Sequence, residues 1–172
     1  MTSRPAPMIL VAVALASILA GCAPASEPSP TSTSAFADEA EAFAAAEETY
    51  RAYVDALNAV REDPTASDPQ DFLIGEALEI DIDTQQQLDQ ADLVIVGSTS
   101  VVDVEGLETS PDLTQVQIAV CMDSTDTRVI DGAGKDVTPQ DRPAQTRVRV
   151  QLERFDNGLV ISESDLMDED SC

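Results

Sequence analysis

The stretch Thr146-Arg-Val-Arg-Val-Gln-Leu-Glu-Arg-Phe155 decides the fold, because its central residues alternate one by one between polar and apolar side chains. A period of two is the pattern of a β-strand with one buried face. The side chains predicted to be buried are those of Val148, Val150 and Leu152. Arg147 and Arg149 then share the opposite face of the same strand.

Other segments show the same alternation or are rich in β-branched residues, which favour strands. The full set of predicted strands is Leu93–Glu105, Thr114–Asp123, Arg128–Ile130, Thr146–Phe155 and Leu159–Glu163. In the second of them, the predicted buried residues are Val116, Ile118 and Val120. Asp131-Gly132-Ala133-Gly134 predicts a turn, and Asn157-Gly158 is a strong signal for a tight hairpin. Strands joined in this way form an antiparallel sheet.

The segment before these strands has a helical period. Its large side chains fall seven residues apart, at Phe36, Phe43, Tyr50 and Leu57. With the apolar residues between them they form one stripe along a helix, which favours a role in the core over ligand binding. Ser34 is the predicted N-cap. Asp63-Pro64 ends the helix, because a residue before proline avoids helical dihedral angles.

Asp71–Gln90 fits either helical or strand spacing, and its run of glutamines favours a helix. We therefore expect two helices here, or one that is broken near Gly75. Helices that precede an antiparallel sheet bury their apolar faces by covering one side of it. The predicted class is α+β, with N-terminal helices packed on a curved antiparallel sheet of 4–5 strands.

Composition excludes several classes of protein. Of the 172 residues, 43% are hydrophobic, which is too many for a fully disordered chain despite a formal net charge of −24. With 33 acidic against 9 basic residues, no nucleic-acid partner is expected. The chain has no His, which removes the commonest general base and zinc ligand.

Residues 1–21 have the layout of a secretory signal, with Arg4, the apolar run Met8–Leu19 and small residues at the end. The run is shorter than the roughly 20 residues that span a bilayer. Leu19-Ala20-Gly21-Cys22 resembles the lipobox of bacterial lipoproteins. The resemblance implies that Cys22 is lipidated, so that acyl chains anchor the protein on the membrane. An uncut N-terminal anchor is the alternative.

The segment after the lipobox predicts a tether. Residues 22–34 are rich in Pro, Ser and Thr and show no apolar periodicity, as in a disordered linker. Residues 35–172 form the predicted domain. The expected location is extracytoplasmic, on the cell membrane.

Two further cysteines, Cys121 and Cys172, remain when Cys22 is lipidated. In an oxidising compartment such an even pair predicts a disulfide. The alternative is a reactive thiol pair, which the surrounding carboxylates disfavour, because they do not lower the pKa of a thiol.

Helices followed by a curved antiparallel sheet are the order of the NTF2-like (SnoaL-like) cone fold. Ala44–Tyr53 resembles the first helix of actinobacterial lipoproteins with this fold, and Val120–Ser124, Val129–Lys135 and a final cysteine resemble their later segments. The chain departs from the pattern after Gly158, where such proteins often carry an aromatic residue. The resemblance implies a conical pocket between helices and sheet, but no common activity.

The family's enzymes use an aspartate inside the pocket, often with a histidine or tyrosine. The candidates here are Asp81, Asp83, Asp103 and Asp123, with the phenols of Tyr50 and Tyr53. One inward-facing aspartate is expected by chance among so many carboxylates, and solvated or capping roles are the expectation. Glu79-Ile-Asp81-Ile-Asp83 lacks the pattern of a calcium loop. We therefore expect no catalytic residue, no metal site and no cofactor.

Arg147 and Arg149 stand out in so acidic a chain. Cross-strand ion pairs with Asp or Glu are the expected role. An anion or carboxylate site on the sheet, with Arg154 as a further member, is the alternative.

These observations predict a membrane-anchored extracytoplasmic lipoprotein that serves as a noncatalytic binding or scaffolding module of the cell envelope. The first alternative is a small-molecule carrier or an enzyme that uses the cone pocket. The second is an accessory subunit of a secretion or cell-wall complex. The membrane is contacted through the N-terminal lipid, and the partner is an unidentified protein or small molecule. An open cavity with a carboxylate favours a ligand, whereas a filled cone favours a scaffold.

Overall fold

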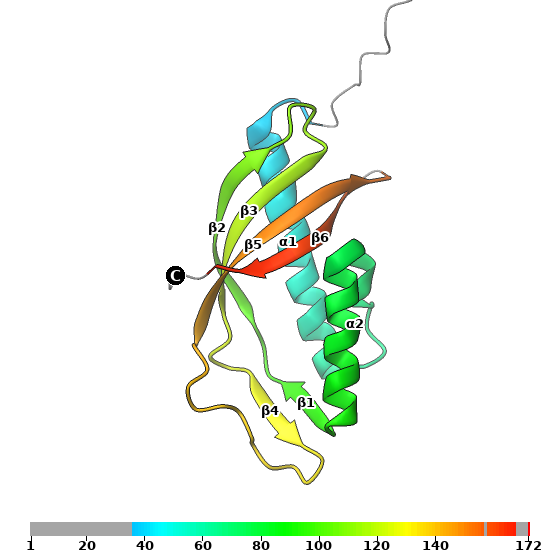
Figure 1. The fold of residues 1–172 in the computed structure, drawn as a ribbon, viewed down its shortest axis with the longest axis vertical. Coiled ribbons are helices and arrows are strands. Elements are labelled where there is room, and N and C mark those ends of the chain that lie inside the picture. The colour runs from blue at the N-terminus through cyan, green and yellow to red at the C-terminus, as the bar shows by residue number, and fades with distance from the viewer. Residues whose placement is uncertain (1–35, 157, 168–171) are drawn as a thin grey trace, which may run out of the picture. The chain divides into compact units, whose positions relative to one another are not determined.

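The computed structural model describes residues 36–156, 158–167 and 172. Helices come first: α1 (Glu39–Glu62), the short 3-10 helix η1 (Pro69–Phe72) and α2 (Gly75–Gln90). The strands follow as β1 (Leu93–Val96), β2 (Ser100–Thr109), β3 (Gln115–Asp123), β4 (Arg128–Asp131), β5 (Gln145–Phe155) and β6 (Gly158–Leu166). This order confirms the α+β class (Figure 1). The predicted signal, Cys22 and the linker lie outside the described residues.

The N-cap of α1 is Asp38, so the prediction of Ser34 is wrong. Asp38 Oδ1 accepts a hydrogen bond from the Glu41 backbone N–H at 3.0 Å, and Glu41 Oε2 accepts one from the Ala37 N–H at 2.6 Å. This reciprocal pair resembles a capping box. The negative charges of the two side chains also stabilise the helix, because its N-terminus is the positive end of the helix dipole. At the other end, Asp63 before Pro64 is the C-cap, as predicted.

The predicted break near Gly75 is confirmed. Gly75 has a φ of 55°, a left-handed conformation that favours glycine. The break is tied to the sheet, because the Ile74 N–H donates to the Ile161 carbonyl at 2.9 Å and Leu73 bridges in parallel to Ile161. The end of η1 and the start of α2 are therefore fixed against β6.

The single predicted strand Leu93–Glu105 is wrong, because the chain divides at Gly97 into β1 and β2. Gly97 has a φ of 83°, and a Cβ there would lie 2.1 Å from the Asp126 carbonyl oxygen. The close approach and the backbone conformation both require glycine. β1 pairs with β4 in a separate antiparallel ribbon, while β2 joins the main sheet.

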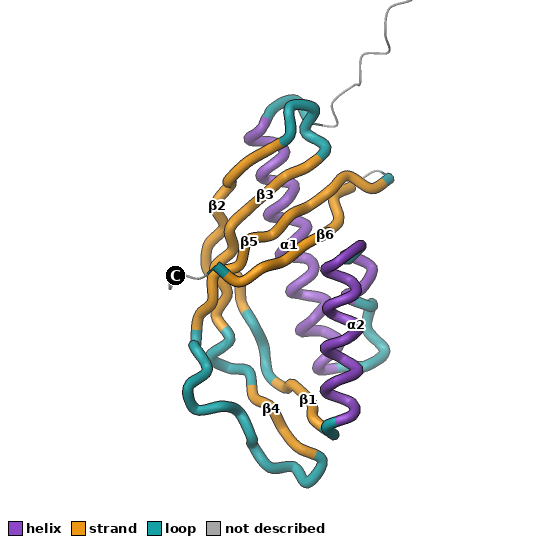
Figure 2. Tube along the Cα trace, in the orientation of Figure 1, coloured by secondary structure: helices purple, strands orange, loops and turns teal. Residues whose placement is uncertain are grey.

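The main sheet has the order β2-β3-β5-β6 and is antiparallel throughout. Register shifts within β2 and between β5 and β6 mark bulges, which bend and twist the sheet. Figure 2 shows these strands passing over α1. The final hairpin is tight, because Phe155 pairs with Gly158. The turn at 131–134 is also confirmed, with the Gly134 N–H donating to the Asp131 carbonyl at 2.8 Å.

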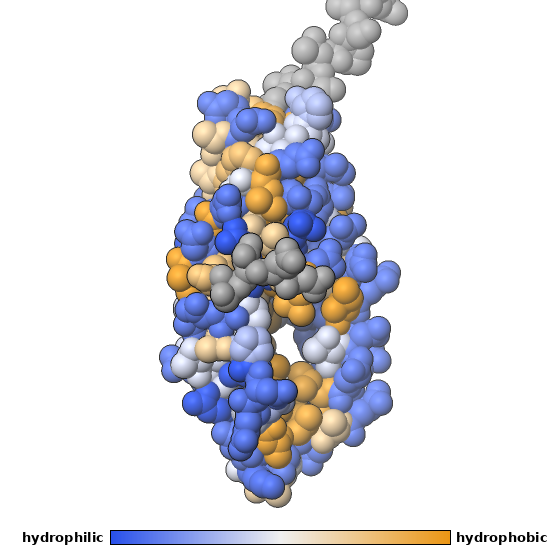
Figure 3. Space-filling view, turned by 60° about the vertical axis from the view of Figure 1, so that its left-hand side comes forward, coloured by the Kyte–Doolittle hydropathy of each residue, from blue (hydrophilic) through white to orange (hydrophobic). Residues whose placement is uncertain are grey.

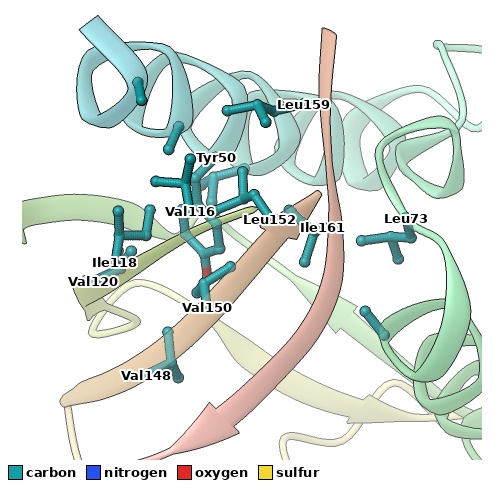
Figure 4. Packing of buried hydrophobic residues seen from close by; sticks show 14 residues of the cluster. Tyr50, Leu73, Val116, Ile118, Val120, Val148, Val150, Leu152, Leu159 and Ile161 are labelled. Carbon is teal, nitrogen blue, oxygen red and sulfur yellow. The ribbon is translucent and has the colours of Figure 1, made fainter. Parts of the chain in front are cut away.

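The core lies between α1 and the inner face of the sheet, and every strand residue predicted to face inward is buried. The fully buried strand side chains include Val116, Ile118, Val120, Val150, Leu152 and Ile161. Ala42 and Ala46 are buried on α1 and are small enough for the helix to approach the sheet closely. Tyr50 points from α1 toward these strands (Figure 4). Among the described residues, no helix is long and apolar enough to cross a membrane.

Candidate functional site

A cavity of about 330 Å³ lies between α1, α2 and the inner face of the main sheet. Its apolar lining includes Val54, Leu57, Leu73, Ala77, Ile80 and Ile161. Figure 3 shows the surface hollowed beside apolar side chains below the middle of the view. Of the two helices that line the cavity, α1 packs on β2, β3 and β6 of the main sheet, whereas α2 packs on β6 and on β1 of the separate ribbon.

A second hollow of about 500 Å³ adjoins the first. The residues that line both hollows are Tyr53, Leu57, Arg61, Asp81 and Thr84. Three of these side chains carry polar groups suited to recognition: a guanidinium and a phenol from α1, and a carboxylate from α2. The polar centre of the site therefore lies where the two hollows meet.

Arg61 extends from the last turn of α1 into the cavity. Its Nη1 donates to Thr99 Oγ1 at 3.1 Å and to Asn58 Oδ1 at 3.3 Å. Asn58 holds Thr99 in place, donating to its carbonyl at 2.8 Å and accepting from its N–H at 2.9 Å. Burial lowers the pKa of Arg61, but a guanidinium stays protonated at neutral pH. Within the described part of the chain, no carboxylate lies within ion-pair distance of Arg61.

Asp81 is the one of the four candidate aspartates that lines the cavity. Its Oδ2 accepts hydrogen bonds from Gln85 Nε2 at 2.7 Å and from Gln70 Nε2 at 3.0 Å. Gln85 lies one helical turn further along α2, and Gln70 belongs to η1. Both donors are neutral amides, so the charge of Asp81 has no cationic partner within the described residues.

The other three aspartates lie elsewhere. Asp83 and Asp103 are exposed. Asp123 accepts from the Thr125 N–H at 2.8 Å and from Gln145 Nε2 at 2.9 Å. Hydrogen bonds from Thr125 and Gln145 lower the pKa of Asp123 to about 2, which makes it a poor general base. Its role is to cap the turn that follows β3.

The two tyrosines are neutral at physiological pH. Burial raises the pKa of Tyr50, whose hydroxyl donates to Met122 Sδ at 3.1 Å. Burial also raises the pKa of Tyr53 to about 12; Asp81 contributes to the rise and Arg61 opposes it. The Tyr53 ring centroid lies 5.8 Å from that of Tyr50 and 6.4 Å from that of Phe72. Both phenols contribute to packing, as predicted, and Tyr53 also lines both hollows.

Arg147 and Arg149 lie on the outer face of the sheet, away from the cavity. Arg147 forms an ion pair with Glu105 of β2, which confirms the predicted cross-strand pairing for that residue. Arg149 is exposed and has no ion-pair partner in the described part of the chain, and Arg154 is likewise exposed there. An anion site formed by this group stays a prediction.

The predicted disulfide is confirmed between Cys121 and Cys172, whose Cα atoms are 5.5 Å apart. It lies on the outer face of the sheet, because Cys121 alternates with the inward-facing Val120. Among the described residues, no group of three His, Cys, Asp or Glu side chains converges in a way that could hold a metal ion. This includes the alternating carboxylates at 79–83.

Sequence reasoning missed Arg61. The signal was the helical stripe itself, because Arg61 follows Tyr50, Val54 and Leu57 at spacings of four, three and four residues. A charged residue at a position of the apolar stripe faces the core or a cavity. Its partner Asn58 lies three residues earlier on the same helix, whereas Thr99, just before β2, is brought to Arg61 by a tertiary contact that no local pattern indicates.

No family model matches the chain, and no curated protein matches it. Among solved structures, it is similar to the intermembrane space region of the chloroplast protein ARC6. The match has a TM-score of 0.48 and 16% sequence identity, and it covers 71% of this chain and 96% of that one. A likeness at this level supports no inference about function.

Proposed function

We propose that the chain is a bacterial envelope lipoprotein, held on the extracytoplasmic face of the membrane by a lipid on Cys22. Its domain of residues 35–172 is then an NTF2-like module that binds a small ligand without converting it. The lipobox at 19–22 supports the anchor. The disulfide between Cys121 and Cys172 supports an oxidising compartment outside the cytoplasm. Two helices over a bent antiparallel sheet support the NTF2-like assignment.

The observation that carries the ligand-binding role is the cavity of about 330 Å³ between α1, α2 and the sheet. Binding sites for small molecules are concave and mostly apolar, with a few polar groups that orient the ligand. Here apolar side chains form about half of the lining, and Arg61, Asp81 and Tyr53 are among the residues that add polar groups. A helix-covered sheet whose interior is completely filled would have supported a scaffold instead.

The chemistry of the cavity favours binding over catalysis. A general base needs a pKa close to the working pH and a place next to the reacting group. The phenols of Tyr50 and Tyr53 have raised pKa values and keep their protons. The two amides that hold Asp81 are suited to fix a carboxylate for recognition.

A second candidate function is protein scaffolding. It rests on the ribbon of β1 and β4, where Val94 is 56% exposed and Val96 is 38% exposed on the same face of β1. Neighbouring exposed apolar side chains on a strand favour contact with another protein. This role is compatible with ligand binding, because β1 contributes only Ile95 to the second hollow.

The experiment is equilibrium dialysis of indole, a small neutral probe, against the full lipidated chain in lipid nanodiscs, with empty nanodiscs subtracted. Thr84 is exposed and lines both hollows, so Thr84→Trp should obstruct them and reduce indole binding. Gln86→Trp, on the same helix but outside both linings, is the matched control. Equal indole binding by the two variants, or none by the unaltered chain, would remove the proposal.

A further inference from the structure

Two opposite charges enter the same cavity from different helices without meeting. Arg61 projects from α1 and Asp81 from α2, and both line both hollows. Within the described residues they form no ion pair with each other or with any third side chain. We infer that the cavity takes a small zwitterion with an apolar body, the chemistry of a free apolar amino acid, with its carboxylate on Arg61 and its ammonium on Asp81. This inference rests on the proposed ligand-binding function.

The anionic half follows from a comparison of the half-buried arginines. The guanidinium of Arg142 is occupied, because it donates to Thr127 Oγ1 at 2.7 Å, to the Ser124 carbonyl at 2.9 Å and to the Thr127 carbonyl at 3.1 Å. Arg147 pairs with Glu105. In the described structure Arg61 instead donates through Nη1 alone, and only to neutral oxygens.

A guanidinium carries five N–H donors, and its fork fits a carboxylate in a bidentate way. Two or more donors of Arg61 therefore remain for a ligand. None of the described carboxylates lies within ion-pair distance of Arg61, so its guanidinium is free to pair with the anionic group of a ligand. Partial burial strengthens such a pair relative to one on the open surface.

The cationic half follows from the hydrogen bonds of Asp81. Both amide donors bind Oδ2, which leaves Oδ1 without a described hydrogen bond. An ionised carboxylate accepts at both oxygens, so Oδ1 keeps its capacity to accept from a ligand ammonium. Gln70 and Gln85 hold the carboxylate from η1 and from α2, which fixes its position before the ligand arrives.

The apolar body follows from the walls of the first hollow. Leu73 lies between η1 and α2, Ile80 belongs to α2 and Ile161 to β6, and all three line this hollow beside the small side chain of Ala77. A branched aliphatic or aromatic side chain of a ligand would be buried there. Each methylene removed from water contributes about 0.8 kcal/mol, so the apolar group adds affinity while the two charges set orientation.

The test is calorimetric titration of the full chain in nanodiscs with L-leucine and with two analogues that each lack one charge: isocaproate, without the ammonium, and isoamylamine, without the carboxylate. We expect leucine to bind about ten-fold or more tightly than either analogue, the factor that one charged hydrogen bond provides. Arg61→Gln should lower leucine affinity to that of isoamylamine. Asp81→Asn should lower it to that of isocaproate.

Matched controls are Arg154→Gln and Glu79→Gln, which change exposed residues outside both hollows and should leave leucine binding unaltered. Indole binding by the Arg61 and Asp81 variants verifies that the cavity is intact. The inference is overturned if leucine binds no more tightly than the two analogues. It is also overturned if neither Arg61→Gln nor Asp81→Asn changes the affinity for leucine. If indole binds to the unaltered chain and not to Thr84→Trp, but leucine does not bind, the zwitterion inference is wrong and the proposed ligand-binding function still stands. If neither probe binds, the proposed function fails with it.

Discussion

Cys121, in the second half of β3, is bonded to Cys172, so the end of the chain is covalently attached to the sheet face opposite the helices. The two residues are 51 positions apart, and β4, β5 and β6 lie between them. The bond therefore closes a loop that contains half of the main sheet. The cavity lies on the other face, so the disulfide and the cavity are on opposite sides of the sheet.

The disulfide should contribute strongly to stability. A cross-link over a loop of this length stabilises the folded state by about 4 kcal/mol in the chain-entropy model, less any strain. We expect Cys121→Ala combined with Cys172→Ala to lower the free energy of unfolding by an amount up to that figure, measured by denaturant titration. Cys172→Ala alone should produce most of the loss. An unchanged denaturation midpoint would show that the bond does not constrain the chain.

Two glycines with positive φ should respond differently to alanine. Gly97 (φ 83°) lies against the Asp126 backbone, whereas Gly134 (φ 80°) has open space where a Cβ would be. Gly134→Ala should cost about 1 kcal/mol, for the backbone conformation alone. Gly97→Ala should cost about 2 kcal/mol or more, because a backbone contact must also move. Thermal unfolding of the pair is the measurement, and equal losses would contradict the close approach at Gly97.

Stability should fall at alkaline pH because of the tyrosines. Burial raises the pKa of Tyr53 to about 12 from the ordinary value of 10.0 for a tyrosine, and it also raises the pKa of Tyr50. A group with a raised pKa stabilises the fold fully below the unfolded pKa, and this contribution is lost as pH rises through the folded pKa. Unfolding should therefore become easier between pH 10 and 12.

The absorbance of phenolate reports the ionisation of these tyrosines directly, because Tyr50 and Tyr53 are the only two tyrosines of the chain and it has no tryptophan. The native chain should titrate at higher pH than the same chain in denaturant, and Tyr53→Phe should make the loss of stability between pH 10 and 12 smaller. Native and denatured chains that titrate together would contradict the burial of these phenols.

The lipid anchor predicts a specific chemical state for Cys22. Mass spectrometry of protein from cell membranes should find this cysteine acylated at the N-terminus of the processed chain. Cys22→Ala should remove the acyl chains and the processing, whereas Cys172→Ala should leave both in place. Unacylated Cys22 in membrane-derived protein would refute the anchor.

The strand faces could be predicted from the sequence because alternation is local. Every second residue from Val148 to Leu152 is apolar, and Val148, Val150 and Leu152 are all buried in the core. The division of Leu93–Glu105 into two strands could not be predicted from the sequence, because β-branched residues lie on both sides of Gly97. The backbone of Gly97 lies against Asp126, which is far along the chain. A pattern that reports one segment at a time does not contain such a contact.

The candidate site shows the same limit. Asp81 was among the predicted carboxylates, but three other aspartates had equal standing in the sequence. The packing of α2 against β6 is what brings Asp81 into the lining of the cavity that Arg61 of α1 also lines. Arg61 itself follows the apolar stripe of its helix, which indicates an inward position but not whether a cavity or a core surrounds it.

If the cavity between α1 and α2 receives a ligand, an NMR titration of the isotope-labelled chain in nanodiscs with indole will locate it. We expect the largest amide shifts to cluster at cavity residues such as Leu57, Ala77 and Ile161, with little change around the disulfide. Shifts confined to the exposed face of β1 at Val94 and Val96, or absent altogether, would contradict it.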